Sequence, residues 1–166
     1  SKCRLFTSES HGLAKAAGIF QGERTIPVLL EYFEQLGSGD DFRRMCILDS
    51  LIFNPDRHYG NFGVMFDTET MEPICMCPVF DNNRSLFPDL DQDQLEHPDW
   101  YLQRCKPMLG KDFLITARAL MTPEIRSDLK NMIGFQFSQH NRIAAPQERL
   151  DALSRIVNLQ IKAIIE

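Results

Sequence analysis

The sequence predicts a mainly α-helical protein with one small β-hairpin near its middle. Apolar residues recur at helical spacing over much of the chain, and two short β-type segments stand on either side of a polar turn. No internal repeat is present. With 166 residues, 43% of them hydrophobic and 25% charged, the chain has the composition of a globular protein with a well-formed core. We therefore expect one domain of ordinary size, or one lobe of a larger protein.

The N-terminal segment, residues 1–39, is expected to be a linker with helices. Residues 8–19 have weak helical character, because two glycines interrupt them. Residues 26–36 are a better helix, since Pro27 suits a first turn and apolar residues follow at helical spacing. The run Gly37-Ser38-Gly39 then ends the helix.

The remainder, residues 40–166, is expected to be one structural unit. Asp40 and Asp41 are natural N-caps for a helix over residues 41–53, whose broad apolar face should be largely buried. The C-terminal part, residues 110–166, reads as a helical subdomain. Its predicted helices are 110–121, 123–135 and 146–165, the last with a strong amphipathic stripe.

Two strands are predicted between these helical parts, over residues 62–67 and 74–80. The polar segment 68–73 joins them, so they form a β-hairpin. Pro78 implies that the second strand lies at an edge or is interrupted there. Residues 82–108 are irregular and acidic, which predicts a long surface loop, and loops of this length often carry function.

Charge and composition exclude several classes of protein. The net charge of −5 disfavours broad binding of nucleic acid, which needs a basic face. No apolar run reaches the roughly 18 residues that cross a bilayer, and the start of the chain lacks the apolar stretch of a secretory signal. The five cysteines have no paired C-x-x-C spacing. Reduced thiols in a cytoplasmic protein are the simplest interpretation, and we expect no membrane association.

The stretch that carries chemistry is residues 54–63, Asn-Pro-Asp-Arg-His-Tyr-Gly-Asn-Phe-Gly, followed by Phe80-Asp81-Asn82. Phosphate transfer from ATP needs a carboxylate to orient the attacking hydroxyl and oxygen ligands that hold Mg²⁺ against the phosphates. Kinases place the base Asp and a metal-binding Asn on one loop with four residues between them. Asp56 and Asn61 have that spacing.

The predicted hairpin supplies a third oxygen-bearing group. If its arms pair about a centre near Met71, Asn61 lies opposite Asp81 at the open end. Paired strands lie about 5 Å apart, so these two side chains could share one divalent ion. The sequence thus predicts a metal site formed by residues that are distant in the chain.

The combined motif resembles that of HipA-like serine/threonine kinases. The run N-x-D-R-H-x-x-N-x-G, with Phe-Asp closing the hairpin, is similar to the family's catalytic and metal-binding motifs, and D-R-H-x-x-N also occurs in phosphatidylinositol 3- and 4-kinases. Residues 81–86 resemble the family's Asp-x-Gly-x-Ser-Leu segment, although Asn83 replaces the glycine. The resemblance covers roughly residues 40–120. It implies a protein-kinase-like C-terminal lobe that uses ATP and Mg²⁺.

By this resemblance, Asp56 is the catalytic base, and Asn61 and Asp81 are the metal ligands. Arg57 and His58 would support the loop or approach phosphate. Each residue also has a plainer interpretation, since Asp56 and Asn61 could be turn residues and Asp81 could bond loop amides. For His58 a structural, hydrogen-bonded imidazole is favoured. For Arg57, pairing with a carboxylate and contact with phosphate stay open.

The sequence lacks the glycine-rich loop and the phosphate-binding lysine of the nucleotide-covering lobe of kinases. We therefore expect a C-terminal lobe, excised from a longer protein or naturally truncated, that has little activity alone. Residues that would bind the rest of the nucleotide are not assigned.

Two alternative functions remain open beside a protein kinase. One is a lipid kinase, which the acidic residues 82–99 disfavour because that loop would meet anionic headgroups. The other is a non-catalytic pseudokinase that binds a partner. HipA-like kinases commonly pair with a helix-turn-helix DNA-binding antitoxin or regulator, so such a partner is implied beside a protein substrate.

Overall fold

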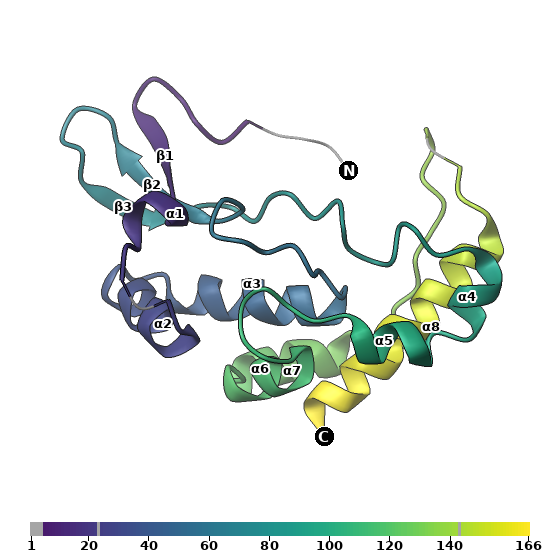
Figure 1. The fold of residues 1–166 in the computed structure, drawn as a ribbon. Helices are drawn as coiled ribbons and strands as arrows, with labels where there is room; N and C mark the ends of the chain where they lie inside the picture. The colour runs from purple at the N-terminus through teal and green to yellow at the C-terminus, as the bar shows by residue number, and fades with distance from the viewer. Residues whose placement is uncertain (1–4, 23, 143) are drawn as a thin grey trace.

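The computed structural model describes residues 5–22, 24–142 and 144–166. Figure 1 shows a small sheet above α2 and α3, with α1 beside the sheet and the remaining helices below and to one side. The elements in chain order are β1 (His11–Lys15), α1 (Ala16–Ile19), α2 (Ile26–Gln35), α3 (Gly39–Leu51), β2 (Gly63–Asp67), β3 (Pro73–Met76), α4 (Gln92–Glu96), α5 (Asp99–Arg104), α6 (Phe113–Ala119), α7 (Pro123–Asn131) and α8 (Gln147–Ile165). The chain is therefore mainly helical, as predicted, with one small antiparallel sheet.

The start of α3 differs from the prediction. The N-cap position is Ser38, whereas Asp40 and Asp41 lie inside the first turn. Acidic side chains there still favour the helix, because they face the positive end of its dipole. The Ser38 hydroxyl is used elsewhere: it accepts a hydrogen bond from the amide of Met76 in β3, at 3.0 Å. This contact ties the edge of the sheet to the beginning of α3.

The sheet has three antiparallel strands in the order β1-β2-β3. The β2–β3 hairpin was predicted, and β3 is an edge strand that ends two residues before Pro78. The third strand was not predicted, so the weak helix expected over residues 8–19 is wrong for 11–15. These residues pair with β2 along its whole length, from His11 opposite Asp67 to Lys15 opposite Gly63. Only α1, after β1, is helical within the predicted range.

Gly63 makes the pairing of β1 with β2 possible. A Cβ atom at this position would lie 2.1 Å from the carbonyl oxygen of Ala14. That distance is far inside van der Waals contact, so no other residue fits without a shift of the backbone. The contact with the chain before β2 continues after β1. The amides of Ala16 and Ala17 donate to the carbonyls of Phe62 and Tyr59, at 3.0 and 2.8 Å.

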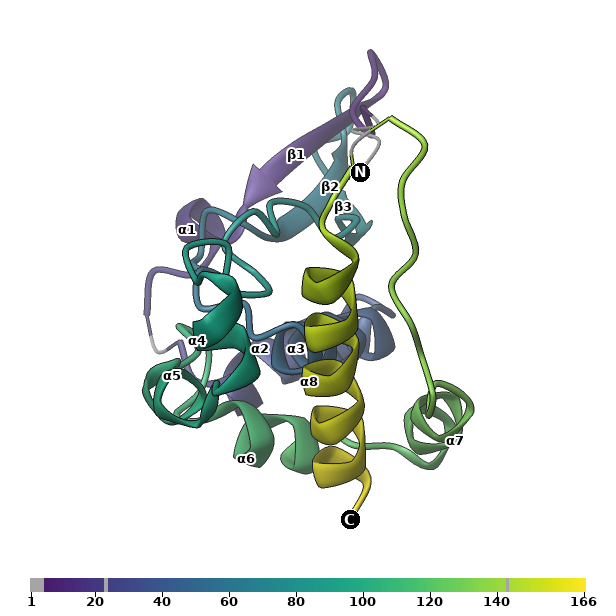
Figure 2. The same cartoon turned by 90° about the vertical axis from the view of Figure 1, so that its right-hand side faces the viewer.

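The C-terminal helices pack around α3. The Ser50 hydroxyl in α3 donates to the carbonyl of Phe113 at the start of α6, at 2.9 Å. Figure 2 shows α8 in front of α3 and next to α6, with α7 set apart and joined to α8 by an extended segment. The last turn of α8 is held by two guanidinium groups, since Arg118 donates to Ala163 O and Arg126 donates to Ile165 O.

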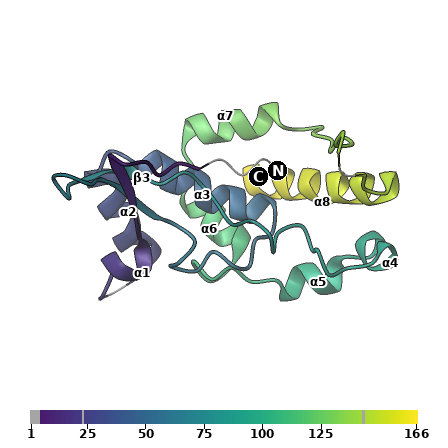
Figure 3. The same cartoon turned by 90° about the horizontal axis from the view of Figure 1, so that it is seen from above.

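The core has two adjoining parts. The larger one lies between α2, α3, the sheet and α8, and includes the stacked rings of Phe33 and Phe42, 5.1 Å apart. The smaller one joins α6 and α8 to the segment around Phe87. Figure 3 shows the corresponding layout, with α1 and α2 at one end of the molecule and α4 and α5 at the other. Residues 52–62 lie where the two parts meet.

The acidic segment 82–108 was predicted to be irregular, but it contains the short helices α4 and α5. Asp91 begins α4 with a capping box: its carboxylate accepts from the amide of Gln94, whose side chain accepts from the amide of Asp91. The Arg104 guanidinium lies 3.9 Å from the Trp100 ring centroid in α5. These short helices are stabilised by local contacts that a single-residue pattern does not reveal.

In the described part of the chain, no helix is both long enough and apolar enough to span a membrane. Four cysteines, Cys46, Cys75, Cys77 and Cys105, are free, and Cys3 lies outside the described residues. Burial raises the pKa of the Cys46, Cys77 and Cys105 thiols above the ordinary value. These thiols are therefore protonated at neutral pH.

We expect the Gly63→Ala substitution to lower the free energy of unfolding by about 1–3 kcal/mol, the usual cost of overpacking. The added methyl group meets backbone rather than a movable side chain. Gly18→Ala is the control, because no atom lies within 4 Å of the added Cβ and the residue is helical. Urea unfolding followed by circular dichroism measures both. Equal effects of the two substitutions would contradict the close approach.

Asp112 makes stability depend on pH at the start of α6. Burial acts to raise its pKa, but Lys106 and the amides of Ile115 and Leu114 outweigh burial and leave the pKa below its usual value. The ionised form is thus favoured in the folded state. Its stabilisation is complete above the unfolded pKa of about 3.9 and is lost as pH falls through the lower folded pKa.

We therefore expect Asp112→Ala to lower the free energy of unfolding by about 1 kcal/mol at pH 7, as for other N-caps. The difference from the wild type should shrink as pH falls below about 4. Urea titrations at pH 7 and at pH 3 measure it. A difference that is the same at both values would show that the carboxylate charge does not matter.

Candidate active site

The segment with the predicted catalytic residues begins where α3 ends. Phe53 has a left-handed backbone, with φ of 49°, which turns the chain away from the helix. A bulky residue adopts this conformation only when its surroundings hold it there. The Phe53 ring is held by two others, those of Phe87 and Phe113, with centroids 5.3 and 5.6 Å away.

Asn54 fixes the position of Asp56. The Asn54 side chain is fully buried, and its amide nitrogen donates to Asp49 Oδ1 at 2.8 Å. Its amide oxygen accepts a hydrogen bond from the backbone N–H of Asp56, at 3.1 Å. The Asp56 carboxylate itself is half-buried. The backbone of the predicted base is thus connected through one side chain to the end of α3.

The loop folds back so that Asn61 reaches the backbone of Asp56. Asn61 Nδ2 donates to the carbonyl of Asp56 at 3.0 Å, and the Asn61 amide donates to the carbonyl of His58 at 2.9 Å. These bonds orient the Asn61 side chain through its nitrogen. Within the described part of the chain, Asn61 Oδ1 accepts no hydrogen bond, so this oxygen can serve as a metal ligand.

His58 lies inside the loop. Its Nδ1 accepts a hydrogen bond from the amide of Gly60 at 3.0 Å, and its own amide donates to the carbonyl of Asp56 at 2.8 Å. Both contacts lie within the loop itself. A Cβ at Gly60 would lie 2.8 Å from the ring, which explains why a glycine stands there. The contacts are those of a supporting residue.

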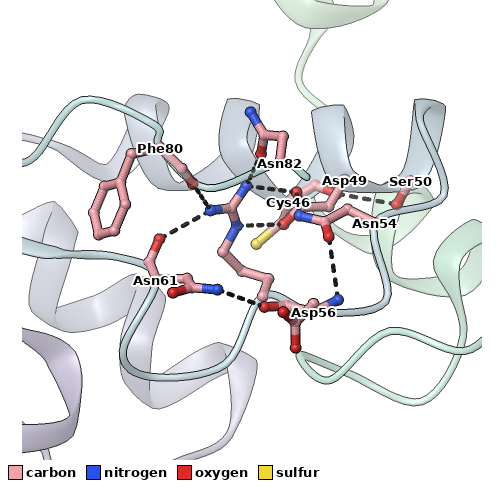
Figure 4. Close-up of polar contacts among 9 residues, drawn as sticks. Cys46, Asp49, Ser50, Asn54, Asp56, Asn61, Phe80 and Asn82 are labelled. Atoms are coloured by element: carbon pink, nitrogen blue, oxygen red, sulfur yellow. Dashed lines mark hydrogen bonds and ion pairs between the residues drawn. The ribbon is translucent and has the colours of Figure 1, made fainter. Parts of the chain in front are cut away.

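Arg57 donates hydrogen bonds to Asp49, Asn61, Phe80 and Asn82, which are labelled in Figure 4. Its side chain is 1% exposed. It donates five hydrogen bonds: Nε to Asp49 Oδ2 and Nη2 to Asp49 Oδ1, both 2.9 Å, Nη1 to Asn61 O at 2.9 Å, Nη1 to Phe80 O at 2.5 Å, and Nη2 to Asn82 Oδ1 at 2.5 Å. Of the two roles foreseen for Arg57, these contacts are those of a residue paired with a carboxylate.

Asp81 follows Phe80, whose carbonyl is one of these acceptors. It is exposed, and its backbone is left-handed with φ of 55°, a conformation that Asp tolerates better than most residues. The chain then turns at 82–85 and returns to the end of α3, where the amide of Leu86 donates to the carbonyl of Ile52 at 2.8 Å. The segment carrying Asp81 is therefore fixed on both sides.

The way in which Asn61 and the Asp81 segment meet differs from the prediction. The register places Met65 opposite Cys75 and Val64 opposite Met76. The centre of the hairpin therefore lies before Met71, on its N-terminal side. The last ladder bond in the described structure runs from the Cys77 amide to Gly63 O, at 3.0 Å. Asn61 is thus not held opposite Asp81 by strand pairing. The guanidinium of Arg57 connects the two segments instead.

Two residues of the site were not assigned a role from the sequence, Asp49 and Asn82. Asp49 is 4% exposed and lies on the apolar side of α3 beside the buried Met45 and Cys46. A carboxylate on an apolar helix face needs a partner, and this is the signal that could have found it. Asn82 had no such signal, because its contact depends on the turn after Asp81.

The donors of this region agree with the chemistry of Mg²⁺. No group of three or more His, Cys, Asp or Glu residues suited to a metal occurs in residues 5–22, 24–142 and 144–166. Mg²⁺ does not require one, since it is usually held by one or two protein oxygens together with water and phosphate oxygens. The exposed carboxylate of Asp81 and the free amide oxygen of Asn61 are donors of that kind.

Comparison with solved structures finds a crystal structure of CtkA, a proinflammatory kinase of Helicobacter pylori, with a TM-score of 0.61. The likeness covers 98% of this chain and 72% of the CtkA chain, at 15% sequence identity. An agreement of this extent at such low identity establishes the fold alone. The chain has a kinase-like fold. No protein family matches the sequence, and no curated protein does. The relation to HipA-like kinases stays a prediction.

We expect Asn54→Ala to lower the free energy of unfolding by about 1–3 kcal/mol, because a buried amide that bonds two segments is lost. Asn83→Ala is the matched control, since Asn83 is exposed and makes no hydrogen bond to another described residue. Its effect should stay within about 0.5 kcal/mol. Urea unfolding measures both variants. Similar values for the two would show that Asn54 does not hold the loop.

Proposed function

We propose that this chain carries the phosphate- and metal-handling part of an ATP- and Mg²⁺-dependent protein serine/threonine kinase of the HipA type. One observation carries the proposal: within a kinase-like fold, one buried guanidinium bonds the backbones of Asn61 and Phe80, and so brings the backbone of Asn61 close to the segment that carries Asp81. Asp56 lies on the same loop as Asn61 and is bonded to it.

The proposed roles follow from the positions of the oxygen atoms. The half-buried carboxylate of Asp56 would orient the hydroxyl of a protein substrate and accept its proton. Asn61 Oδ1 and the Asp81 carboxylate would hold Mg²⁺, which neutralises charge on the ATP phosphates. Arg57 has no N–H left for a phosphate, because all five donate to protein acceptors. His58 would keep the loop in shape.

The substrate and partner are also proposals. Segment 82–99 carries Asp89, Asp91, Asp93, Glu96 and Asp99. Three of these acidic residues already have local roles: Asp89 pairs with Arg84, Glu96 pairs with Arg155, and Asp91 caps α4. The surplus of negative charge disfavours an anionic lipid headgroup and favours a protein hydroxyl. A helix-turn-helix regulator remains the partner that the resemblance implies.

We expect ATP binding to this chain to require Mg²⁺ and to be weakened at least about tenfold by Asp81→Asn. Residues that only hydrogen-bond to a metal ligand already change metal affinity by about that factor. Asp56→Asn should leave binding unchanged, because this residue acts on the hydroxyl. Asp93→Asn is the control, an exposed acidic residue on the same segment. Isothermal titration calorimetry with Mg²⁺ and ATP measures all four proteins.

Phosphate transfer by the full-length protein to a serine-containing substrate such as casein is the second measurement. Asp56→Asn should lower its rate by about 10²–10⁴-fold, the usual contribution of a general base. Full transfer activity in both Asp56→Asn and Asp81→Asn would refute the assigned roles. Binding of Mg²⁺ and ATP without any transfer by the wild type would identify a non-catalytic module instead.

A further inference from the structure

We propose that Asp49 and Arg57 are positioning residues that set the separation of the two metal ligands. This inference rests on the proposed function, because it concerns the same Mg²⁺ site. It assigns a task to a helix residue outside the predicted motif, and it gives Arg57 a task other than phosphate binding.

One nitrogen of Arg57 bonds both ligand-bearing segments. Nη1 of Arg57 donates to Asn61 O at 2.9 Å and to Phe80 O at 2.5 Å. Both carbonyl oxygens therefore lie within hydrogen-bond distance of the same atom. Asn61 belongs to the first ligand segment, and Phe80 directly precedes the second ligand, Asp81. The place of this nitrogen thus decides how far apart the backbones of the two ligand-bearing segments stand.

No strand pairing in the described structure holds these two segments at a fixed separation. Ladder bonds between β2 and β3 end at Cys77 and Gly63. Between residues 59–62 and residues 78–81, no direct backbone hydrogen bond occurs in the described structure. Pro78 cannot donate one, since it has no N–H. Without the guanidinium, the two segments would have no polar connection at the point where the ligands are needed.

Asp49 holds the guanidinium of Arg57 in place. A buried guanidinium needs a counter-charge, and the Asp49 carboxylate supplies it through two parallel hydrogen bonds. Asp49 lies in α3, a helix of 13 residues packed into the core, so the carboxylate is a fixed reference point. The Asn54 amide bonds the same carboxylate. The position of Arg57, and with it that of both ligands, is thus set by the helix.

The spread of the acceptors around residue 57 requires an arginine. The five acceptors lie in three separate segments: α3, the loop with Asn61, and the turn with Phe80 and Asn82. Only the planar guanidinium presents five N–H groups in a fixed fork. A lysine ammonium has three donors at one point and cannot reach all of these acceptors.

Binding of Mn²⁺ alone to this chain tests the inference, with nuclear magnetic resonance as the readout. We expect Mn²⁺ to broaden the amide signals of Asn61 and Asp81 together in the wild type. In Arg57→Lys and in Asp49→Asn the dissociation constant for Mn²⁺ should rise by about 10–100-fold, as for other residues that orient metal ligands. The two signals should also lose their common dependence on Mn²⁺ concentration.

Arg149→Lys is the matched control. Arg149 likewise donates to two backbone carbonyls, those of Leu90 and Phe87, but it lies in α8 away from the ligands. This substitution should lower stability without changing the affinity for Mn²⁺. Equal loss of affinity in Arg149→Lys and Arg57→Lys would mean that the effect is general destabilisation, and it would overturn the inference.

Asn82→Ala keeps the test decisive if the charged variants do not fold. Asn82 is exposed, and its substitution removes one acceptor of Arg57 while the ion pair stays. We expect the dissociation constant for Mn²⁺ to rise about threefold, as for a lost hydrogen bond. An unchanged constant in this variant and in any folded Arg57 or Asp49 variant would refute the inference alone. Absence of Mn²⁺ binding at Asn61 and Asp81 in the wild type would refute the proposed metal site itself.

Discussion

The structure of the candidate site depends on one buried ion pair, that of Arg57 with Asp49. Taking two charges out of water is costly, and the cost is offset only when good geometry and additional hydrogen bonds satisfy both groups. Here all five guanidinium N–H groups have acceptors, and the carboxylate also accepts from Asn54. Such a pair adds little net stability but selects a single arrangement of the backbone around it. Its value lies in that selection.

Much of the helical framework could be predicted from the sequence, because it depends on local features. Pro27, the glycines after α2, the threonine that caps α7 and the apolar stripe of α8 each act within a few residues. The spacing of Asp56 and Asn61 is local too. Strand β1 was missed because a five-residue edge strand has no stability of its own and is defined by its partner, β2. The short helices α4 and α5 were missed because they have only five and six residues, held by a local capping box and by the contact of Arg104 with Trp100.

The connection between the segments that carry Asn61 and Asp81 could not be predicted from the pattern alone. The hairpin register shifts between Met65 and Phe66, so counting residues from the turn gives the wrong partner for Asn61. Several residues around the site also have left-handed backbones, among them Phe53, Asp81 and Phe87. None is glycine, so the sequence gives no sign of these turns. Tertiary packing, rather than local preference, holds them in place.

The position of Gly63 has a consequence for the order in which the site forms. Strand β1 is synthesised first, but it has no partner until β2 has followed, about fifty residues later. The loop with Asp56 and Asn61 lies inside the span of chain that this pairing closes, and its carbonyls at Tyr59 and Phe62 bond the residues just after β1. Bringing the two strands together over that distance costs loop-closure entropy before their contacts form. The loop that carries Asp56 and Asn61 therefore makes its bonds to residues 16 and 17 only once β1 lies beside β2.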